Sequence, residues 1–104
     1  MRVLLDYQGS SIRFTEERRY HVLKHPEMRD LEQEIDRTLS DPDSVVESST
    51  DGTVRLYYRF LLDTLVGDKW LCVVVKSLSN MNFVLTAYVT DRPKQGKLLW
   101  QTSP

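Results

Sequence analysis

The stretch Val54-Arg55-Leu56-Tyr57-Tyr58-Arg59-Phe60-Leu61-Leu62 decides the fold, because nine residues with large side chains follow one another without glycine or proline. In a β-strand, successive side chains point to opposite faces. The stretch therefore predicts a strand with Val54, Leu56, Tyr58, Phe60 and Leu62 on one face and Arg55, Tyr57, Arg59 and Leu61 on the other. We expect the first, more apolar set to face the core.

Three further strands surround this one. Residues 44–48 form a short strand before it, and Ser49-Thr50-Asp51-Gly52 reads as the turn between the two. Gly67-Asp68-Lys69 reads as a looser turn that leads to residues 70–76, which are apolar on both sides, as in a central strand. Residues 83–90 alternate again. The second half of the chain thus predicts a four-stranded antiparallel sheet, followed by a polar tail that leads to Leu98-Leu99-Trp100.

Two helices are expected before the sheet. Thr15 is a good helix N-cap, and the helix should run to about Lys24, because His25 precedes a proline. Pro26 suits the first position of a second helix, which Asp41-Pro42-Asp43 ends. Apolar residues at helical spacing give this second helix one buried stripe: Met28, Leu31, Ile35, Thr38 and Leu39.

The N-terminal residues 3–7 and 11–14 read as a hairpin around Gln8-Gly9-Ser10. The order is then a hairpin, two helices and an antiparallel meander. Segregated helices and strands predict an α+β fold in which the hairpin and both helices pack on one face of the four-stranded antiparallel sheet. A chain of 104 residues forms one domain, residues 1–104, with a core over about residues 12–100.

Composition excludes several classes of protein. Fourteen basic and 15 acidic residues give a net charge of −1, which excludes a uniformly basic nucleic-acid-binding protein. One cysteine, Cys72, excludes a disulfide scaffold, and we expect it to be a core thiol. The N-terminus has no signal-peptide core, and the apolar run Trp70–Val75 is far too short to span a bilayer. We therefore expect a cytoplasmic protein without membrane contact.

The sheet face opposite the helices is the informative surface. If the more apolar set of each strand meets the helices, the free face carries cations, aromatic rings and hydroxyls: Arg55, Tyr57, Arg59, Trp70, Cys72, Val74, Lys76, Thr86, Tyr88 and Thr90. Charge divides in the same way, because residues 1–50 carry −4 and residues 51–104 carry +3. Although the net charge of the whole chain is close to zero, the sheet half is basic and offers a candidate anion-binding surface.

Metal-free RNA cleavage needs a base, an acid and cations that stabilise the phosphorane. Suitable side chains are His21, His25, Arg59, Lys76, Tyr58 and Tyr88. Two histidines four apart can also bind a metal on a helix, but they lack the zinc-protease glutamate, and Pro26 disturbs the helix at His25. We therefore predict no metal and no cofactor. A half-buried sheet with solvated charges is the simpler alternative.

Several segments resemble a known family of small bacterial, especially cyanobacterial, proteins. Residues 19–28 (RYHVLKHPEM) resemble its H-I-L-x-H-P-E segment, and Asp41-Pro42-Asp43-x-Val45 resembles its D-P-D-x-V turn. Tyr57-Tyr58-Arg59, residues 71–76 and residues 83–88 resemble its core strands, and residues 94–100 its K-x-G-x-x-x-W end. The match covers residues 12–100. Such proteins resemble the phage-associated or toxin-like Barnase–EndoU–colicin–RelE-like nucleases.

The resemblance implies a metal-independent endoribonuclease with a RelE/barnase-like fold. The expected catalytic residues are His21, His25, Arg59, Lys76 and Thr86, and the expected binding residues are Arg55, Tyr57, Tyr58 and Tyr88. RNA is then the expected partner, with an antitoxin protein and a second copy of the chain as further candidates. The alternative function is a non-catalytic RNA-binding or protein-interaction module of the same fold.

Overall fold

The computed structural model describes residues 1–103 as one seven-stranded mixed sheet with two α-helices and a short 3₁₀ helix. The strand order is β1-β2-β6-β5-β4-β3-β7. In chain order the elements are β1 (Arg2–Leu5), β2 (Ser11–Phe14), α1 (Glu16–Leu23), η1 (Pro26–Met28), α2 (Glu32–Ser40), β3 (Ser44–Ser48), β4 (Val54–Thr64), β5 (Gly67–Ser77), β6 (Asn82–Thr90) and β7 (Gly96–Gln101). The α+β class is confirmed.

The predicted four-stranded antiparallel sheet is wrong, because both ends of the chain add strands to it. The N-terminal hairpin joins the sheet through a parallel pairing of β2 with β6, at Arg13 and Phe83. The C-terminal residues pair antiparallel with β3. Gly96 allows this pairing, since a Cβ there would lie 2.3 Å from the Glu47 carbonyl oxygen. Local alternation predicts strands, but it does not show which distant strands become neighbours.

Helix α1 begins and ends close to the predicted positions. The Thr15 hydroxyl accepts a hydrogen bond from the Arg18 amide at 3.2 Å, and the chain leaves the helix before His25 and Pro26. The prediction of one continuous second helix from Pro26 is wrong. Pro26–Met28 form a separate 3₁₀ turn, and α2 starts only after Leu31, whose backbone is not helical (φ −110°). Met28 of η1 and Ile35 of α2 are both buried, so the two separate elements each contribute a side chain to the core.

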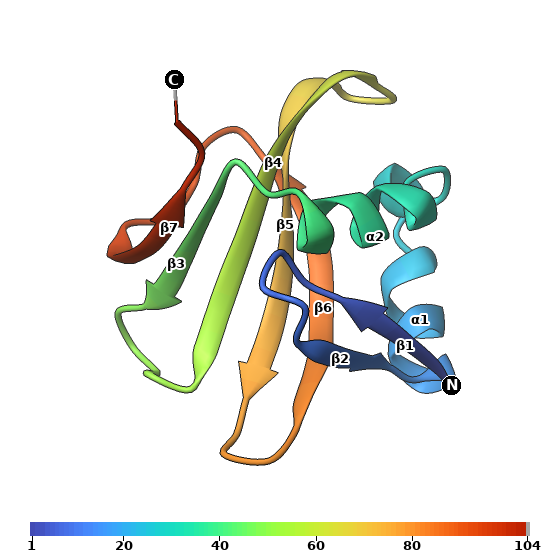
Figure 1. The fold of residues 1–104 in the computed structure, drawn as a ribbon. Coiled ribbons are helices and arrows are strands. Elements are labelled where there is room, and N and C mark those ends of the chain that lie inside the picture. The colour runs from blue at the N-terminus through green and yellow to red at the C-terminus, as the bar shows by residue number, and fades with distance from the viewer. Residues whose placement is uncertain (104) are drawn as a thin grey trace.

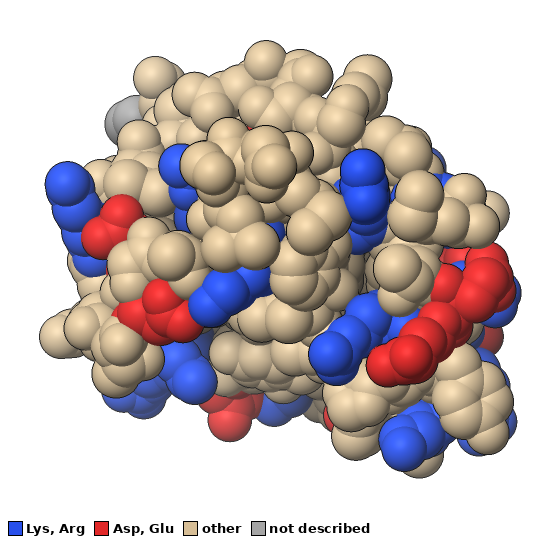
Figure 2. Space-filling model, turned by 90° about the horizontal axis from the view of Figure 1, so that it is seen from below, with Lys and Arg blue, Asp and Glu red and all other residues tan. Residues whose placement is uncertain are grey.

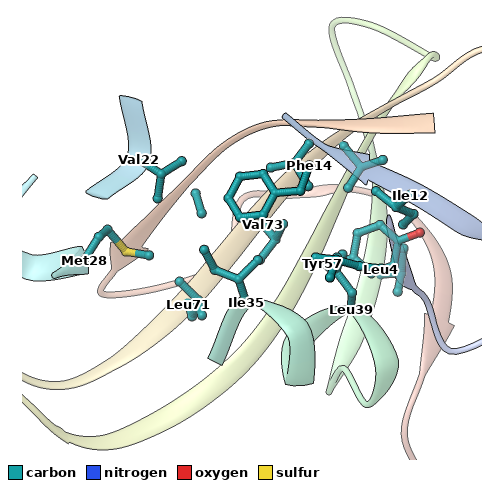
Figure 3. Packing of buried hydrophobic residues seen from close by; sticks show 14 of the residues in the cluster. Leu4, Ile12, Phe14, Val22, Met28, Ile35, Leu39, Tyr57, Leu71 and Val73 are labelled. Carbon is teal, nitrogen blue, oxygen red and sulfur yellow. The ribbon is translucent and has the colours of Figure 1, made fainter. Parts of the chain in front are cut away.

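The sheet curls around its main core. In Figure 1, the N-terminal hairpin and the helices lie in front of the central strands, and α2 crosses them. The turn of the hairpin reaches β7, where the rings of Tyr7 and Trp100 lie 5.0 Å apart. Figure 3 shows the side chains that fill the enclosed space, among them Phe14, Ile35 and Val73. This covered side of the sheet is called the helix face below.

The opposite side of the sheet, called the free face below, is crossed by the connection between β6 and β7. This connection, residues 91–95, runs behind the central strands in Figure 1. The backbone amide of Lys94 donates a hydrogen bond to the Tyr58 hydroxyl at 2.9 Å, which ties the connection to β4. A second, smaller apolar cluster lies there, built on Val46, Leu56, Tyr58 and Cys72.

Candidate functional site

The predicted face of β5 is confirmed, and that of β6 is confirmed from Thr86 to Thr90. A register shift beyond Thr86 reverses Phe83 and Val84, and the predicted face of β4 is wrong. Trp70, Cys72 and Val74 pair with Thr90, Tyr88 and Thr86, so these side chains share the free face. In β4, however, Tyr58 lies opposite Cys72 on the free face, whereas Tyr57 lies opposite Val73 in the main core. Both faces of β4 bury large side chains, so the contrast in apolarity that guided the prediction does not exist.

Tyr57 and Arg59 therefore lie on the helix face, and polar partners explain how they are accommodated there. The Tyr57 hydroxyl donates to the buried carboxylate of Asp6 at 2.8 Å. Burial, and then this hydrogen bond, raise the pKa of Tyr57 well above its usual range. Arg59 forms an ion pair with Glu34 of α2 at 2.7 Å. Arg59 is thus engaged with a helix, on the opposite side of the sheet from Thr86.

Arg55 shares this face of β4, because it lies opposite Val75 of the main core. Its charge lowers the pKa values of Tyr7 and Tyr57, although burial raises both more strongly. The sequence prediction placed Arg55, Tyr57 and Arg59 together, and the structure keeps them together. It places them on the face opposite the one expected, away from Lys76, Thr86, Tyr58 and Tyr88.

The free face gathers three groups that can each carry a proton: the hydroxyls of Tyr58 and Tyr88 and the thiol of Cys72. Burial, reinforced by the neighbouring Cys72, raises the pKa of Tyr58 to about 12. Burial raises the pKa of Cys72 to about 11, although both tyrosine hydroxyls oppose the shift. All three groups are therefore neutral near pH 7. They can donate hydrogen bonds, but Cys72 is no thiolate nucleophile.

A groove lies beside this cluster, under the 91–95 connection. Its volume is about 360 Å³, and it is lined by Ser48, Ser49, Thr50, Val54, Leu56, Val74, Thr86, Tyr88, Lys94 and Gln95. Five of these residues carry hydroxyls and one is a cation, while no carboxylate is among them. The groove, called the crossover groove below, therefore suits a ligand that is anionic or rich in hydrogen-bond acceptors.

A second groove lies between the N-terminal hairpin and the β5–β6 turn. Its volume is about 560 Å³, and it is lined by Val3, Ser10, Ser11, Arg13, Leu78, Ser79, Asn80, Met81 and Asn82. Arg13 is its only charged lining residue. The guanidinium of Arg13 donates a hydrogen bond to the sulfur of Met81 at 3.3 Å. It has no acidic partner among the described residues. This groove is called the Arg13 groove below.

One row of side chains joins the two grooves. In the strand register, Val54 lies opposite Lys76, Lys76 opposite Phe83, and Phe83 beside Arg13, which lies opposite Val3. Residues directly opposite one another point to the same side of a sheet. Five neighbouring strands at about 4.8 Å spacing give the row a length of about 19 Å. Within the row, Lys76 is held by Asp51 at 3.0 Å.

His21 and His25 lie in the other layer. Both belong to the α1–η1 segment, and their rings meet edge to face with centroids 5.9 Å apart. Helix α1 packs its buried Val22 into the main core, on the helix face of the sheet. The structure therefore brings Lys76, Thr86, Tyr58 and Tyr88 to one side and leaves both histidines and Arg59 on the other. The described part of the chain holds no group of three or more candidate metal ligands.

The sequence analysis missed Lys94, Arg13 and the asparagines of the Arg13 groove. Lys94 lies in a polar connection, and only the return of β7 to β3 shows that this connection crosses the free face. Arg13 lies in a hairpin that was expected to pack on the sheet rather than to extend it. Its outward position in Ser11–Phe14, between buried Ile12 and Phe14, was the available signal.

The β3–β4 and β5–β6 turns lie at one end of the molecule. The basic side chains of the described residues do not form a continuous patch there. Figure 2 views the molecule from this end and shows basic side chains in several separate places, with acidic side chains among them. Lys76 of β5 pairs with Asp51 of the β3–β4 turn. This end of the described structure therefore carries no broad positive patch (Figure 2), and an anion bound here would be held by individual contacts.

Comparison of the chain with protein-family models, with curated proteins and with solved structures found no match. Among residues 1–103, no helix is both long enough and apolar enough to cross a membrane. The resemblance to the nuclease group stays a prediction from the sequence.

Proposed function

We propose that the protein is a non-catalytic RNA-binding module that receives a single strand along the free face. The observation that carries the proposal is the row from Val54 to Val3, which connects two grooves that contain Lys94 and Arg13 and no lining carboxylate. Cations that contact phosphates supply the affinity, and aromatic rings supply stacking. Tyr88 and Phe83 lie in the crossover groove and in the row, respectively.

Binding without cleavage is favoured by the placement of the acid–base groups. The histidines and Arg59 lie on the other side of the sheet from Thr86 and Lys76, and Arg59 is paired with Glu34. The groups beside the crossover groove, Tyr58, Tyr88 and Cys72, all have raised pKa values. None is poised to remove a proton near pH 7. The endoribonuclease predicted from the sequence needs His21 or His25 to reach the bound RNA.

The experiment measures fluorescence anisotropy of a labelled 12-nucleotide single-stranded RNA at 50 and 200 mM salt. We expect binding that weakens with salt. The double variant Arg13→Ala/Lys94→Ala should flatten the logarithmic salt dependence by about 1.4, because each phosphate contact of a single strand contributes about 0.7. The matched control is Lys24→Ala/Arg29→Ala, which removes two exposed cations from the helical layer and should leave the salt dependence unchanged.

Three results would overturn the proposal. The first is absence of binding at low salt, and the second is an equal loss of binding in the two double variants. The third is cleavage of the same RNA in EDTA that disappears in His21→Ala/His25→Ala, which would establish the nuclease and contradict a non-catalytic role.

A further inference from the structure

The tip of the β4–β5 hairpin exposes large apolar side chains. Phe60, Leu62, Leu65 and Val66 are 43%, 69%, 70% and 50% exposed. The ring of Trp70 meets Phe60 edge to face at 5.1 Å and extends the apolar surface along the strand. Single exposed apolar residues are ordinary, but a group of this size within one hairpin tip is typical of an interaction surface. The name "hairpin tip" below means residues 60–68.

The tip is an ordered turn. The Asp63 amide donates to the Asp68 carboxylate at 2.9 Å, and the Val66 amide donates to the Thr64 hydroxyl at 3.2 Å. Asp63 and Gly67 both have positive φ angles, 57° and 96°, which fix a tight reversal. The apolar side chains are therefore displayed on a defined scaffold, so a partner would find them already ordered.

The charge of the tip selects among partners. Asp63 and Asp68 are the only charged residues of the tip, and neither forms an ion pair in the described structure. The next cation, Lys69, is paired with Asp91. An apolar surface with two carboxylates that lack a cationic partner repels RNA and anionic lipid. It complements a protein segment with apolar side chains flanked by Lys or Arg.

A groove beside the tip offers room for such a segment. It lies between the tip and α2, has a volume of about 350 Å³, and is lined by Leu31, Glu34, Arg37, Arg59, Phe60, Leu61, Leu62, Asp63 and Thr64. Glu34 is held by both Arg59 and Arg37. Two cations, Arg37 and Arg59, therefore balance Glu34 and Asp63 in the groove itself, and the excess negative charge lies at the turn, where Asp68 adds a second carboxylate. An apolar anchor in this groove would bury the exposed edge of Leu62.

We propose that the hairpin tip docks a partner protein through a short segment whose apolar side chains are flanked by basic residues. The tip lies at the opposite end of β4 and β5 from the Arg13 groove, at the top of Figure 1. The proposal is therefore independent of RNA binding, and both surfaces can be occupied at once.

The test uses two synthetic 14-residue peptides of the same length and leucine content, one with lysines and one with glutamates at its polar positions. Chemical shifts of ¹⁵N-labelled full-length protein are followed during titration. We expect the lysine peptide to bind, with the largest shifts in residues 60–70, and the glutamate peptide not to bind. Leu65→Ser/Val66→Ser should lower the affinity for the lysine peptide about tenfold or more. The two substitutions remove exposed apolar contacts and leave the core intact.

Two further variants complete the test. Asp63→Asn/Asp68→Asn keeps the side-chain oxygen that accepts the Asp63 amide and removes both charges, and it should weaken the lysine peptide severalfold. Leu98→Ser removes a leucine of β7 that is 54% exposed, and it should leave binding of the lysine peptide unchanged. Equal binding of both peptides, shifts outside the tip, binding to anionic vesicles, or concentration-dependent self-association through the tip would each overturn the proposal.

Discussion

Tyr57 and Tyr58 are neighbours in β4 and both are buried, but their hydroxyls form hydrogen bonds on opposite faces of the sheet. Tyr57 points to the helix face, where its hydroxyl donates to Asp6 inside the main core. Tyr58 points to the free face, where its hydroxyl accepts the Lys94 amide at the edge of the crossover groove. One tyrosine completes a closed core, and the other supports a surface that a ligand can reach. The helix face of the sheet thus closes over the main core, whereas the free face borders a groove.

The free face tolerates polar groups because much of it stays in contact with water. Its apolar cluster is small, and Val74, Trp70 and Tyr88 are only partly buried there. Hydroxyls and cations at its margin keep contact with water and lose little solvation. On the helix face, by contrast, a polar group needs a protein partner, as Arg59 has in Glu34.

The largest expected effect compares two valines of β5. Val75 is fully buried on the helix face, whereas Val74 is half-buried on the free face. Val75→Ala should lower the free energy of unfolding by about 2.5 kcal/mol and Val74→Ala by about 1 kcal/mol, because only the first leaves a closed cavity. Urea denaturation of both variants measures the difference. Equal losses would show that the faces are equally closed.

The second comparison removes one hydroxyl from each tyrosine. Tyr57→Phe leaves a buried Asp6 carboxylate oxygen without a donor and should cost about 2 kcal/mol. Tyr58→Phe should cost less than about 1 kcal/mol, since the Lys94 amide lies in an exposed connection where water can replace the hydroxyl. Thermal unfolding of the two variants ranks them, and a larger loss for Tyr58→Phe would contradict the assignment of the faces.

A third prediction concerns pH and the Cys72 thiol. Burial raises its pKa from 9.0 to about 11 in the folded protein. The unfolded chain therefore releases this proton first, so the stability that the neutral thiol contributes is complete below pH 9 and is lost as the pH rises from 9 to 11. The tyrosines act in the same direction only above pH 10. Urea denaturation should show that the free energy of unfolding falls between pH 9 and 10, and that it falls less steeply in Cys72→Ala. An identical pH dependence in the two proteins would contradict the prediction.

Much of the fold follows from local sequence. The cap at Thr15, the end of α1 before Pro26 and the alternation in β4 and β6 each depend on residues close in the chain, and they predict the elements well. The added strands β1, β2 and β7 depend on pairings between distant residues, such as Arg13 with Phe83. No local pattern reports such a pairing.

The site was predictable only in part for the same reason. Thr86, Tyr88 and Lys76 were placed on the free face because β5 alternates throughout and β6 alternates from Thr86 to Thr90. The register shift beyond Thr86, which turns Phe83 to the free face, has no local signal in the sequence. Arg55, Tyr57 and Arg59 were misplaced because β4 is buried on both faces, and only the contacts with Asp6 and Glu34 reveal its orientation. Lys94 could not be assigned without the crossover.

The central claim is that RNA occupies the free face, and a titration followed by amide chemical shifts tests it directly. Adding the 12-nucleotide single-stranded RNA to ¹⁵N-labelled protein should move the amides of Arg13, Asn82, Thr86 and Lys94. Those of α1 and α2 should stay in place. Shifts concentrated at His21 and His25 on the helical side, with the free face unmoved, would contradict the account.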